Sequence, residues 1–289
     1  MESTRVTFPH GATKETARVV GVVDLAEGVG HPRHQGSGVI TNATPFHPLD
    51  HTWPDQPGDV GWLAGAQVVD CLTAAKSADG PVLIGESVTA RRGDPGWAWL
   101  AVHVLAEDQE PPEVGQEVLL EVDEGFRHEL SAAHTACHLA ALALNMVAAP
   151  YWRKDPGRSD SLGHPDLDSL AITESHIGPM RAADDYRLGK SIRKKGLNSE
   201  ALLGQLPELA EQATAVLREW LATGAPVTID TDGDPTVAAR RTWRCELPPG
   251  PASYPCGGTH VASLSEIPAE AGVSYQRTDE GFRALTTLL

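Results

Sequence analysis

Two short runs of metal-ligand residue types constrain this chain more than any other feature. His134 and His138 stand four residues apart in the run HTACH, and Cys256 and His260 stand four apart in CGGTH. On a helix, the first spacing aims two imidazoles at one point, and the glycines of the second run allow a tight turn that does the same. Two such pairs make a tetrahedral zinc set. The runs lie far apart in the sequence, so we predict a site that a folded domain builds for chemistry. Single histidine pairs are more often core or surface residues.

The length and composition indicate what kind of protein carries that site. A length of 289 residues suits two modest domains or one large one. No apolar run approaches the ~20 residues that a membrane span requires, and the first residues lack a basic segment followed by an apolar core, so we expect no secretory signal. The four cysteines form no compact framework. We therefore expect a cytoplasmic protein with reduced thiols. We take Cys137, between the two histidines, as a core residue rather than a ligand.

The net charge of −16 argues against a nucleic-acid partner, because Lys and Arg normally supply the phosphate contacts. One stretch, 186–196, reverses this balance with five basic residues and no acidic one. Smaller basic groups lie within 153–158 and 240–244. A basic patch on an acidic body suits a partner bound along one face; an ordinary solvated surface is the alternative.

The hydrophobic pattern predicts an α+β fold in two parts. Residues 1–112 form short β-rich segments that Gly, Pro, Asp and Asn separate, which predicts a small barrel-like or sandwich module. The expected strands are 17–23, 38–44, 67–73, 81–84 and 97–105. A Pro pair within 110–113 favours a linker, so the second domain is expected at 113–289.

The second part mixes strands with helices. We expect a strand at 117–122, and then a buried helix at 125–147, which has no internal Pro. Apolar residues recur at three- and four-residue spacing in 200–222, which predicts one helix or a pair. Further strands are expected at 169–173, 227–229 and 242–245.

The residues around both runs resemble the editing domains of alanyl-tRNA synthetases and their free-standing relatives, the AlaX-type trans-editing proteins. That family pairs HxxxH, often HTAxHL, with a distant CGGTHV and a Glu-Ile pair. This chain has HTACHL at 134–139, CGGTHV at 256–261 and Glu266–Ile267, and Asp123 and Arg127 match the approach to the first run. The editing domain of threonyl-tRNA synthetase shares the two-motif plan more distantly.

The resemblance extends to the N-terminal part, where 8–23 and GVITNATPFHP at 38–48 are similar to the β-module ahead of the editing domain. It therefore covers nearly the whole chain and implies a β-barrel-like module followed by a two-layer α/β editing domain. Since no aminoacylation domain is recognisable, it implies the free-standing form.

One loop departs from the family pattern. The family carries GGGQPxDxG where this chain has 47–61, which keeps Gln56, Pro57, Asp59 and Gly61 but replaces the Gly triplet with bulkier residues. That family loop lines the aminoacyl pocket, so the identity of the amino acid stays open. A second metal held by the histidines and acidic residues of 47–55 is an alternative to a solvent-exposed polar loop, which we prefer.

The resemblance implies an ATP-independent aminoacyl-tRNA deacylase that uses Zn²⁺ to hydrolyse the ester of a mischarged tRNA carrying a Ser-, Gly-, Ala- or Thr-like amino acid. The implied zinc ligands are His134, His138, Cys256 and His260. The catalytic candidates are His260, Thr259, Gly258 and Gln56. The substrate-binding candidates are Thr44, Gln56, Asp59 and Gly257. The candidates for contacting tRNA, at its acceptor stem and 3′ end, are Arg187, Lys190, Arg193, Lys194 and Lys195.

Two other functions remain open. The editing scaffold could serve a zinc-dependent hydrolase of a small molecule, which the acidic charge and the altered loop favour. It could instead be a non-catalytic tRNA-binding module with a structural metal. We expect no membrane or DNA partner, and a monomer or homodimer.

Overall fold

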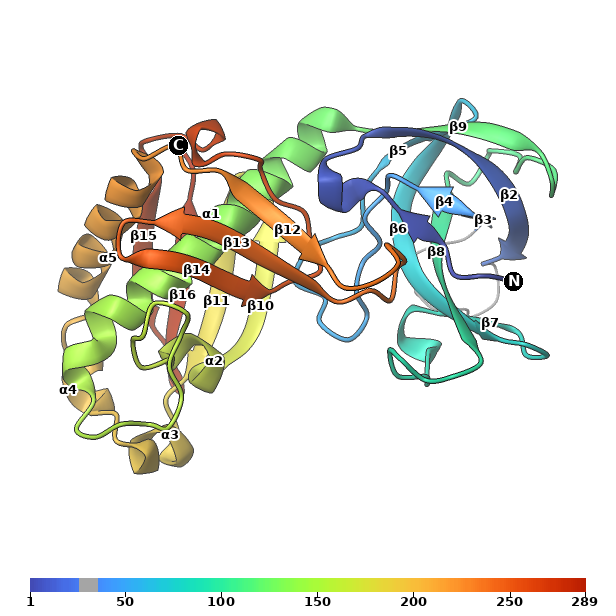
Figure 1. Ribbon diagram of the computed structural model, residues 1–289. Helices are drawn as coiled ribbons and strands as arrows, with labels where there is room; N and C mark the ends of the chain where they lie inside the picture. Colours follow the sequence, from blue (N-terminus) through green and yellow to red (C-terminus); the bar gives the residue numbers. More distant parts are fainter. Residues whose placement is uncertain (26–35) are drawn as a thin grey trace. The chain divides into compact units, whose positions relative to one another are not determined.

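The structure is a computed structural model that describes residues 1–25 and 36–289 (Figure 1). It contains two compact units. Unit 1 comprises Met1–His128, Thr231–Arg241 and Gly257–Thr259, and unit 2 comprises Glu129–Asp230, Thr242–Cys256 and His260–Leu289. The fold mixes helices with a larger share of strands, which confirms the predicted α+β class. The domain division at residue 112 stays a prediction.

Unit 1 is built on a seven-stranded sheet in the order β5-β9-β2-β3-β8-β6-β7, in which β5 also pairs with β6. Its pairs are antiparallel. The strands are β2 (Lys14–Asp24), β3 (Ser37–Thr41), β5 (Gly61–Leu63), β6 (Ala66–Ser77), β7 (Val82–Ile84), β8 (Trp97–Leu105) and β9 (Glu117–Val122). A parallel pair, β1 (Arg5–Val6) and β4 (Ala43–Thr44), and the single turns η1 (Phe8–His10) and η2 (Gly85–Ser87) complete the unit. The expected strands are confirmed, except that 38–44 is divided at Asn42 into β3 and β4, which belong to different sheets. The barrel-like shape stays a prediction.

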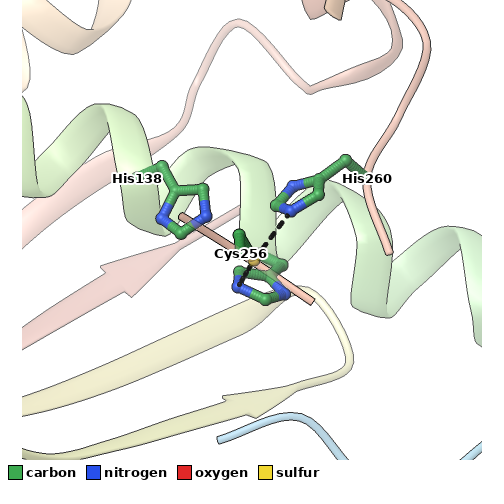
Figure 2. Close-up of side chains that lie close together, drawn as sticks. His138, Cys256 and His260 are labelled. Atoms are coloured by element: carbon green, nitrogen blue, oxygen red, sulfur yellow. Dashed lines mark hydrogen bonds between the residues drawn. The ribbon is translucent and has the colours of Figure 1, made fainter. Parts of the chain in front are cut away.

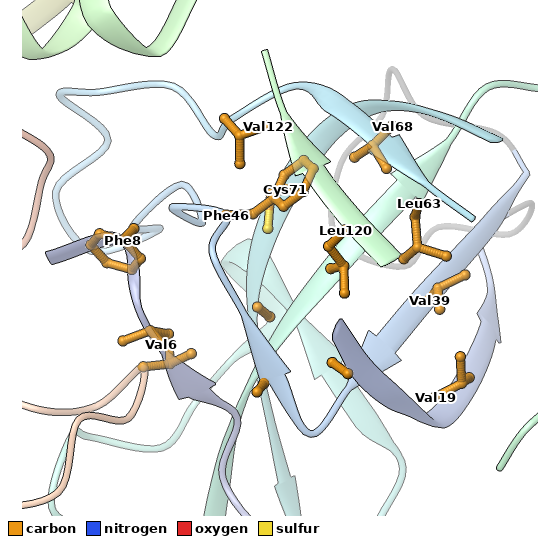
Figure 3. Packing of buried hydrophobic residues seen from close by; sticks show 14 of the residues in the cluster. Val6, Phe8, Val19, Val39, Phe46, Leu63, Val68, Cys71, Leu120 and Val122 are labelled. Carbon is orange, nitrogen blue, oxygen red and sulfur yellow. The ribbon is translucent and has the colours of Figure 1, made fainter. Parts of the chain in front are cut away.

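The core of unit 1 explains why these segments form strands. Along β9, Val118, Leu120 and Val122 are buried and the residues between them are more exposed, as the alternation of a half-buried strand requires. They meet inward side chains of several other strands in one apolar cluster (Figure 3). Besides Leu120 and Val122, the labelled members of the cluster are Val6, Phe8, Val19, Val39, Phe46, Leu63, Val68 and Cys71.

Unit 2 contains two sheets and most of the helices. A four-stranded antiparallel sheet has the order β10-β11-β16-β15, and a three-stranded sheet has the order β12-β13-β14. The strands are β10 (Ile172–Gly178), β11 (Arg181–Arg187), β12 (Val227–Thr231), β13 (Arg241–Leu247), β14 (Gly250–Pro255), β15 (Gly272–Arg277) and β16 (Gly281–Thr287). The helices and turns are α1 (Glu124–Ala148), η3 (Ala149–Tyr151), α2 (Leu167–Ala171), α3 (Lys190–Lys195), α4 (Ser199–Leu203), α5 (Leu206–Leu221) and η4 (Leu264–Glu266).

One predicted strand is wrong. Residues 169–173 were expected to be extended, but 167–171 form α2 and β10 begins only at Ile172. Asp166 is the reason, because its side chain accepts the backbone N–H of Ser169 and caps the first turn of the helix. The predicted paired helices in 200–222 are confirmed as α4 and α5, and α5 packs against β15.

Helix α1 carries the first histidine pair and is the longest helix of the chain that the structure describes. Asp123 precedes it and accepts the N–H of Phe126, as a helix-capping residue does. By length and composition, the segment Glu124–Tyr151 could cross a membrane, but 78% of its most apolar window is buried inside the protein. Such burial is typical of the core helix of a folded domain.

Candidate metal centre

The four predicted ligands come together within unit 2. One donor atom from each of His134, His138, Cys256 and His260 lies within 4.8 Å of the other three. Two turns of α1 supply His134 and His138, whose ring centroids are 4.8 Å apart. Cys256 follows the end of β14, and His260 comes four residues later. Figure 2 shows His138 and His260 directed toward Cys256.

Two of the donor–donor distances are close to those of a zinc site. The Cys256 Sγ lies 3.4 Å from Nε2 of His134 and 3.3 Å from Nε2 of His260. With Zn–S bonds of about 2.3 Å and Zn–N bonds of about 2.1 Å, donors of a tetrahedral site lie about 3.4–3.6 Å apart. His138 adds a second observation. Its Nε2 is buried and has no hydrogen-bond partner among the described residues, which is costly for a polar atom unless it serves a ligand.

A hydroxyl on α1 fixes the tautomer of His260. The Thr135 hydroxyl donates to the carbonyl of Ser131 at 2.8 Å, so its oxygen is an acceptor toward other neighbours. Nδ1 of His260 lies 3.1 Å from this oxygen and therefore carries a proton. The lone pair then falls on Nε2, the nitrogen that faces Cys256. Metal-binding histidines are typically oriented in this way by a partner on their other nitrogen.

Aromatic side chains surround His138. Its ring stacks on Tyr254 with centroids 4.8 Å apart and meets Trp243 edge-on at 5.3 Å. Burial, and secondly the neighbouring His134, lower the pKa of His138 well below its usual value. The ring is therefore neutral at physiological pH, which is the state that binds a metal.

Two predicted site residues of unit 1 bind each other. The amide of Gln56 donates to the Thr259 hydroxyl at 2.8 Å, and the Thr259 N–H donates back to the Gln56 carbonyl oxygen at 3.0 Å. Both side chains are buried. In the same run, Gly258 is buried, whereas Gly257 is exposed and a Cβ there would meet open space. Gln56 therefore holds the residue next to His260 in a defined orientation.

The other two predicted substrate-binding residues are buried in unit 1. The Thr44 hydroxyl lies 2.7 Å from Nε2 of His103, whose Nδ1 donates to the carbonyl of Val39. Asp59 forms an ion pair with Arg127 that includes a 2.8 Å bond from the guanidinium Nε, and it also accepts the N–H of His47. These partners give Thr44 and Asp59 structural roles within the unit.

The altered loop has its own contacts. Asp50 pairs with Arg92 at 2.8 Å, and His51 stacks on Trp99 with centroids 6.3 Å apart. Among the residues that the structure describes, no second group of three metal-ligand side chains comes together. The loop is therefore held by an ion pair and an aromatic stack.

The five residues predicted to contact tRNA lie at the end of β11 and on α3. All five side chains are exposed, and only Arg187 has an ion pair in the described structure, with Glu280. The structure places a second basic segment, which contains Arg153 and Lys154, beside the end of α3. The sequence did not predict that these two basic segments are neighbours. The N–H of Arg153 donates to the carbonyl of Gly196, which ends α3, and the Lys154 side chain lies against Gly196.

Sequence reasoning also missed the residues that contact the four predicted ligands. Thr135 stands inside the HTACH run, directly after His134, and this position could have indicated a role beside the predicted ligands. Tyr254 and Trp243 gave no such signal, because they reach His138 only through the β13–β14 hairpin.

Comparison with known proteins supports the predicted resemblance. No family model matches the chain. The alanyl-tRNA editing protein AlaX-M of Pyrococcus horikoshii is 25% identical over 231 residues, which cover 80% of this chain and 77% of that protein. The alanine–tRNA ligase of Synechococcus sp. strain JA-3-3Ab is 25% identical over 95% of this chain, and that of Caulobacter sp. strain K31 is 28% identical over 62%.

These matches differ in how much of each relative they cover. The matched region spans only 27% of the Synechococcus ligase and 19% of the Caulobacter ligase, but most of AlaX-M. The comparisons thus confirm the resemblance to the AlaX-type editing proteins, which the two histidine-containing motifs predict.

Proposed function

We propose that the protein is a metal-dependent aminoacyl-tRNA deacylase that acts in trans on mischarged tRNA. The observation that carries this proposal is the convergence of the HTACH and CGGTH donors within 4.8 Å of one another. Similarity to AlaX-M over most of both chains supports the reaction class. The amino acid removed is small, of the Ser, Gly, Ala or Thr type.

The four predicted ligands share one task in this proposal. His134, His138, Cys256 and His260 hold Zn²⁺, and neutral imidazoles and a thiolate are the donors that this ion prefers. Bound zinc would supply Lewis-acid polarisation, a water of lowered pKa, or an anchor for the substrate amino group. Thr135 keeps the Nε2 lone pair of His260 directed toward the site.

Gly257, Gly258 and Thr259 serve the aminoacyl ester. Such an ester is already activated, so orientation and stabilisation of the developing oxyanion suffice. We assign the oxyanion contacts to the backbone amides of Gly257 and Gly258 and to the Thr259 side chain. Gln56 positions Thr259 through their paired hydrogen bonds.

We assign the contacts with the tRNA phosphates to a group of basic residues on the surface of unit 2. Arg193, Lys194 and Lys195 end α3, and Arg153 and Lys154 lie beside that end. In the described part of the chain none of these five cations makes an ion pair, although the protein carries a net charge of −16. Exposed cations without carboxylate partners remain available for phosphates. A tRNA partner also implies a cytoplasmic location.

A deacylation assay tests the proposal. Ala-, Ser-, Gly- and Thr-tRNA are each incubated with the zinc-loaded protein and with protein treated with a chelator. Turnover of at least one of them that the chelator abolishes and zinc restores is the expected result. Binding of tRNA without turnover would identify a non-catalytic module, and neither binding nor turnover would favour the small-molecule hydrolase.

A further inference from the structure

Two aromatic residues of one hairpin hold the imidazole of His138. Trp243 on β13 and Tyr254 on β14 are directly paired in the antiparallel register, so their side chains leave the same face of the hairpin. The Tyr254 ring lies nearly parallel to the imidazole, at an interplanar angle of 11°. The plane of His138 therefore depends on where Tyr254 lies.

A buried carboxylate anchors Tyr254 at its far end. The Tyr254 hydroxyl donates to Oδ2 of Asp168 at 3.4 Å, and the Tyr186 hydroxyl donates to Oδ1 at 2.8 Å. Asp168 is only 8% exposed, and its burial raises the pKa of the carboxyl to about 7. A carboxyl removed from water to this degree requires the hydrogen bonds that it receives.

Asp168 is itself fixed relative to the helix that carries His138. Its backbone N–H donates to Oδ1 of Asn145 at 2.9 Å. Asn145 is fully buried on α1, seven residues after His138, and so lies on the same face of the helix two turns further on. One residue of α2 therefore ties the ring that packs on His138 to the helix from which His138 extends.

We propose that Asp168 is a positioning residue for the metal centre, which holds His138 in its ligating orientation through the Tyr254 hydroxyl. The proposal rests on the metal site of the proposed function but not on its tRNA substrate. Outer partners of metal-bound histidines typically contribute 10- to 100-fold to metal affinity. Because Asp168 acts through a stacked ring, we expect an effect at the lower end, about tenfold.

Three single variants test the link. Tyr254→Phe removes the Tyr254–Asp168 hydrogen bond while it keeps the ring, and Asp168→Asn keeps the side-chain volume but leaves one acceptor oxygen for the two tyrosine hydroxyls. Tyr186→Phe is the matched control, because it removes the other hydroxyl on Asp168 but changes no ring that stacks on His138. Zn²⁺ affinity is measured by competition with a chromophoric chelator, and the absorption spectrum of the Co²⁺-substituted protein reports the ligand geometry.

The expected pattern is specific. Tyr254→Phe and Asp168→Asn bind Zn²⁺ about tenfold more weakly and shift the Co²⁺ spectrum, whereas Tyr186→Phe retains wild-type affinity and spectrum. The double variant D168N/Y254F binds no more weakly than Tyr254→Phe alone, since both substitutions act on the same hydrogen bond.

Three results would overturn the inference. The first is wild-type affinity in both Tyr254→Phe and Asp168→Asn, and the second is an equal loss in Tyr186→Phe, which would indicate a general packing effect. If Asp168→Asn does not fold, Tyr254→Phe alone decides. The third is a wild-type protein that binds no zinc, which would remove the metal site of the proposed function as well; the first two leave that function intact.

Discussion

The Thr135 hydroxyl oxygen lies 3.1 Å from Nδ1 of His260 and, because its own proton is given to Ser131, it can only accept from that nitrogen. A residue one position after the first ligand thus sets the protonation of the last one. The two motifs are therefore joined by a hydrogen bond, in addition to the metal ion that we propose they share.

Replacing Thr135 with Val tests this link, because Val keeps the branched shape but has no oxygen to accept. We expect Thr135→Val to weaken Zn²⁺ binding about tenfold or more. Thr135→Ser retains the hydroxyl and should stay near wild type. Affinity by chelator competition is the measurement, and equal affinity in Val and Ser variants would contradict the tautomer argument.

Removing a predicted ligand should lower the zinc affinity more than removing a residue that only orients a ligand. Cys256→Ser and His134→Ala each leave three donors, so we expect zinc affinity to fall by more than the about 100-fold that outer partners reach at most. Metal content after gel filtration, measured by atomic emission, gives the result. Cys245→Ser is the control, since this buried thiol belongs to no metal-ligand group. A Cys256→Ser protein that retains a full equivalent of zinc would exclude Cys256 as a ligand.

The sequence predicted the group of four side chains because metal-binding residue types at fixed spacing are rare and require no knowledge of the fold. His134 and His138 follow from helix periodicity alone, and α1 forms where the apolar pattern predicts it. Tyr254 and Asp168 could not be found in this way. Their contacts depend on the register of β13 with β14 and on the packing of α2, which are long-range properties.

The error at α2 has a local cause. Leu170, Ile172 and Thr173 favour a strand by propensity, but one capping side chain, Asp166, stabilises a helical turn just before them. Asp59 shows that contacts between residues distant in the sequence are also hard to predict. The sequence identified it as a retained residue of the altered loop, but its buried partner Arg127 is 68 positions away in the sequence.

The Asp59–Arg127 pair yields a prediction on stability. Their side chains are 0% and 7% exposed, so Asp59→Asn leaves a buried guanidinium without its counter-charge. We expect the free energy of unfolding in urea to fall by about 3–5 kcal/mol. Arg244→Met, which removes an exposed ion pair with Asp230, should cost less than about 1 kcal/mol. Equal losses in the two variants would show that burial of the Asp59 pair does not matter.

The basic surface yields a prediction on salt dependence. Neutralising Arg193, Lys194 and Lys195 to Gln removes up to three phosphate contacts, each of which contributes about 0.7–0.9 to the slope of log K against log salt. We therefore expect weaker tRNA binding and a slope smaller by about two. The triple variant of Arg244, Arg277 and Arg283 to Gln has the same charge change on exposed residues elsewhere. If both variants lose the same slope, the net charge rather than α3 determines binding.

Buried His103 makes the stability of unit 1 depend on pH. Burial lowers the pKa of His103 to about 4, compared with about 6.5 in an unfolded chain. Its neutral ring donates from Nδ1 to Val39 and accepts from the Thr44 hydroxyl at Nε2. The stability due to this neutral form is fully present above pH 6.5. It is lost as the pH falls through 6.5 toward 4, because the unfolded chain binds a proton that the folded chain excludes.

Urea unfolding of metal-free protein at pH 7.5 and pH 5 measures this loss. We expect the wild type to lose more stability between these values than His103→Gln, by an amount on the order of 2 kcal/mol. The difference between the two proteins isolates His103 from the other histidines. Parallel stability curves would contradict the argument, and so would an NMR titration in which the His103 ring protonates near pH 6.5, because protonation at that pH requires that water reach the Thr44–His103 hydrogen bond.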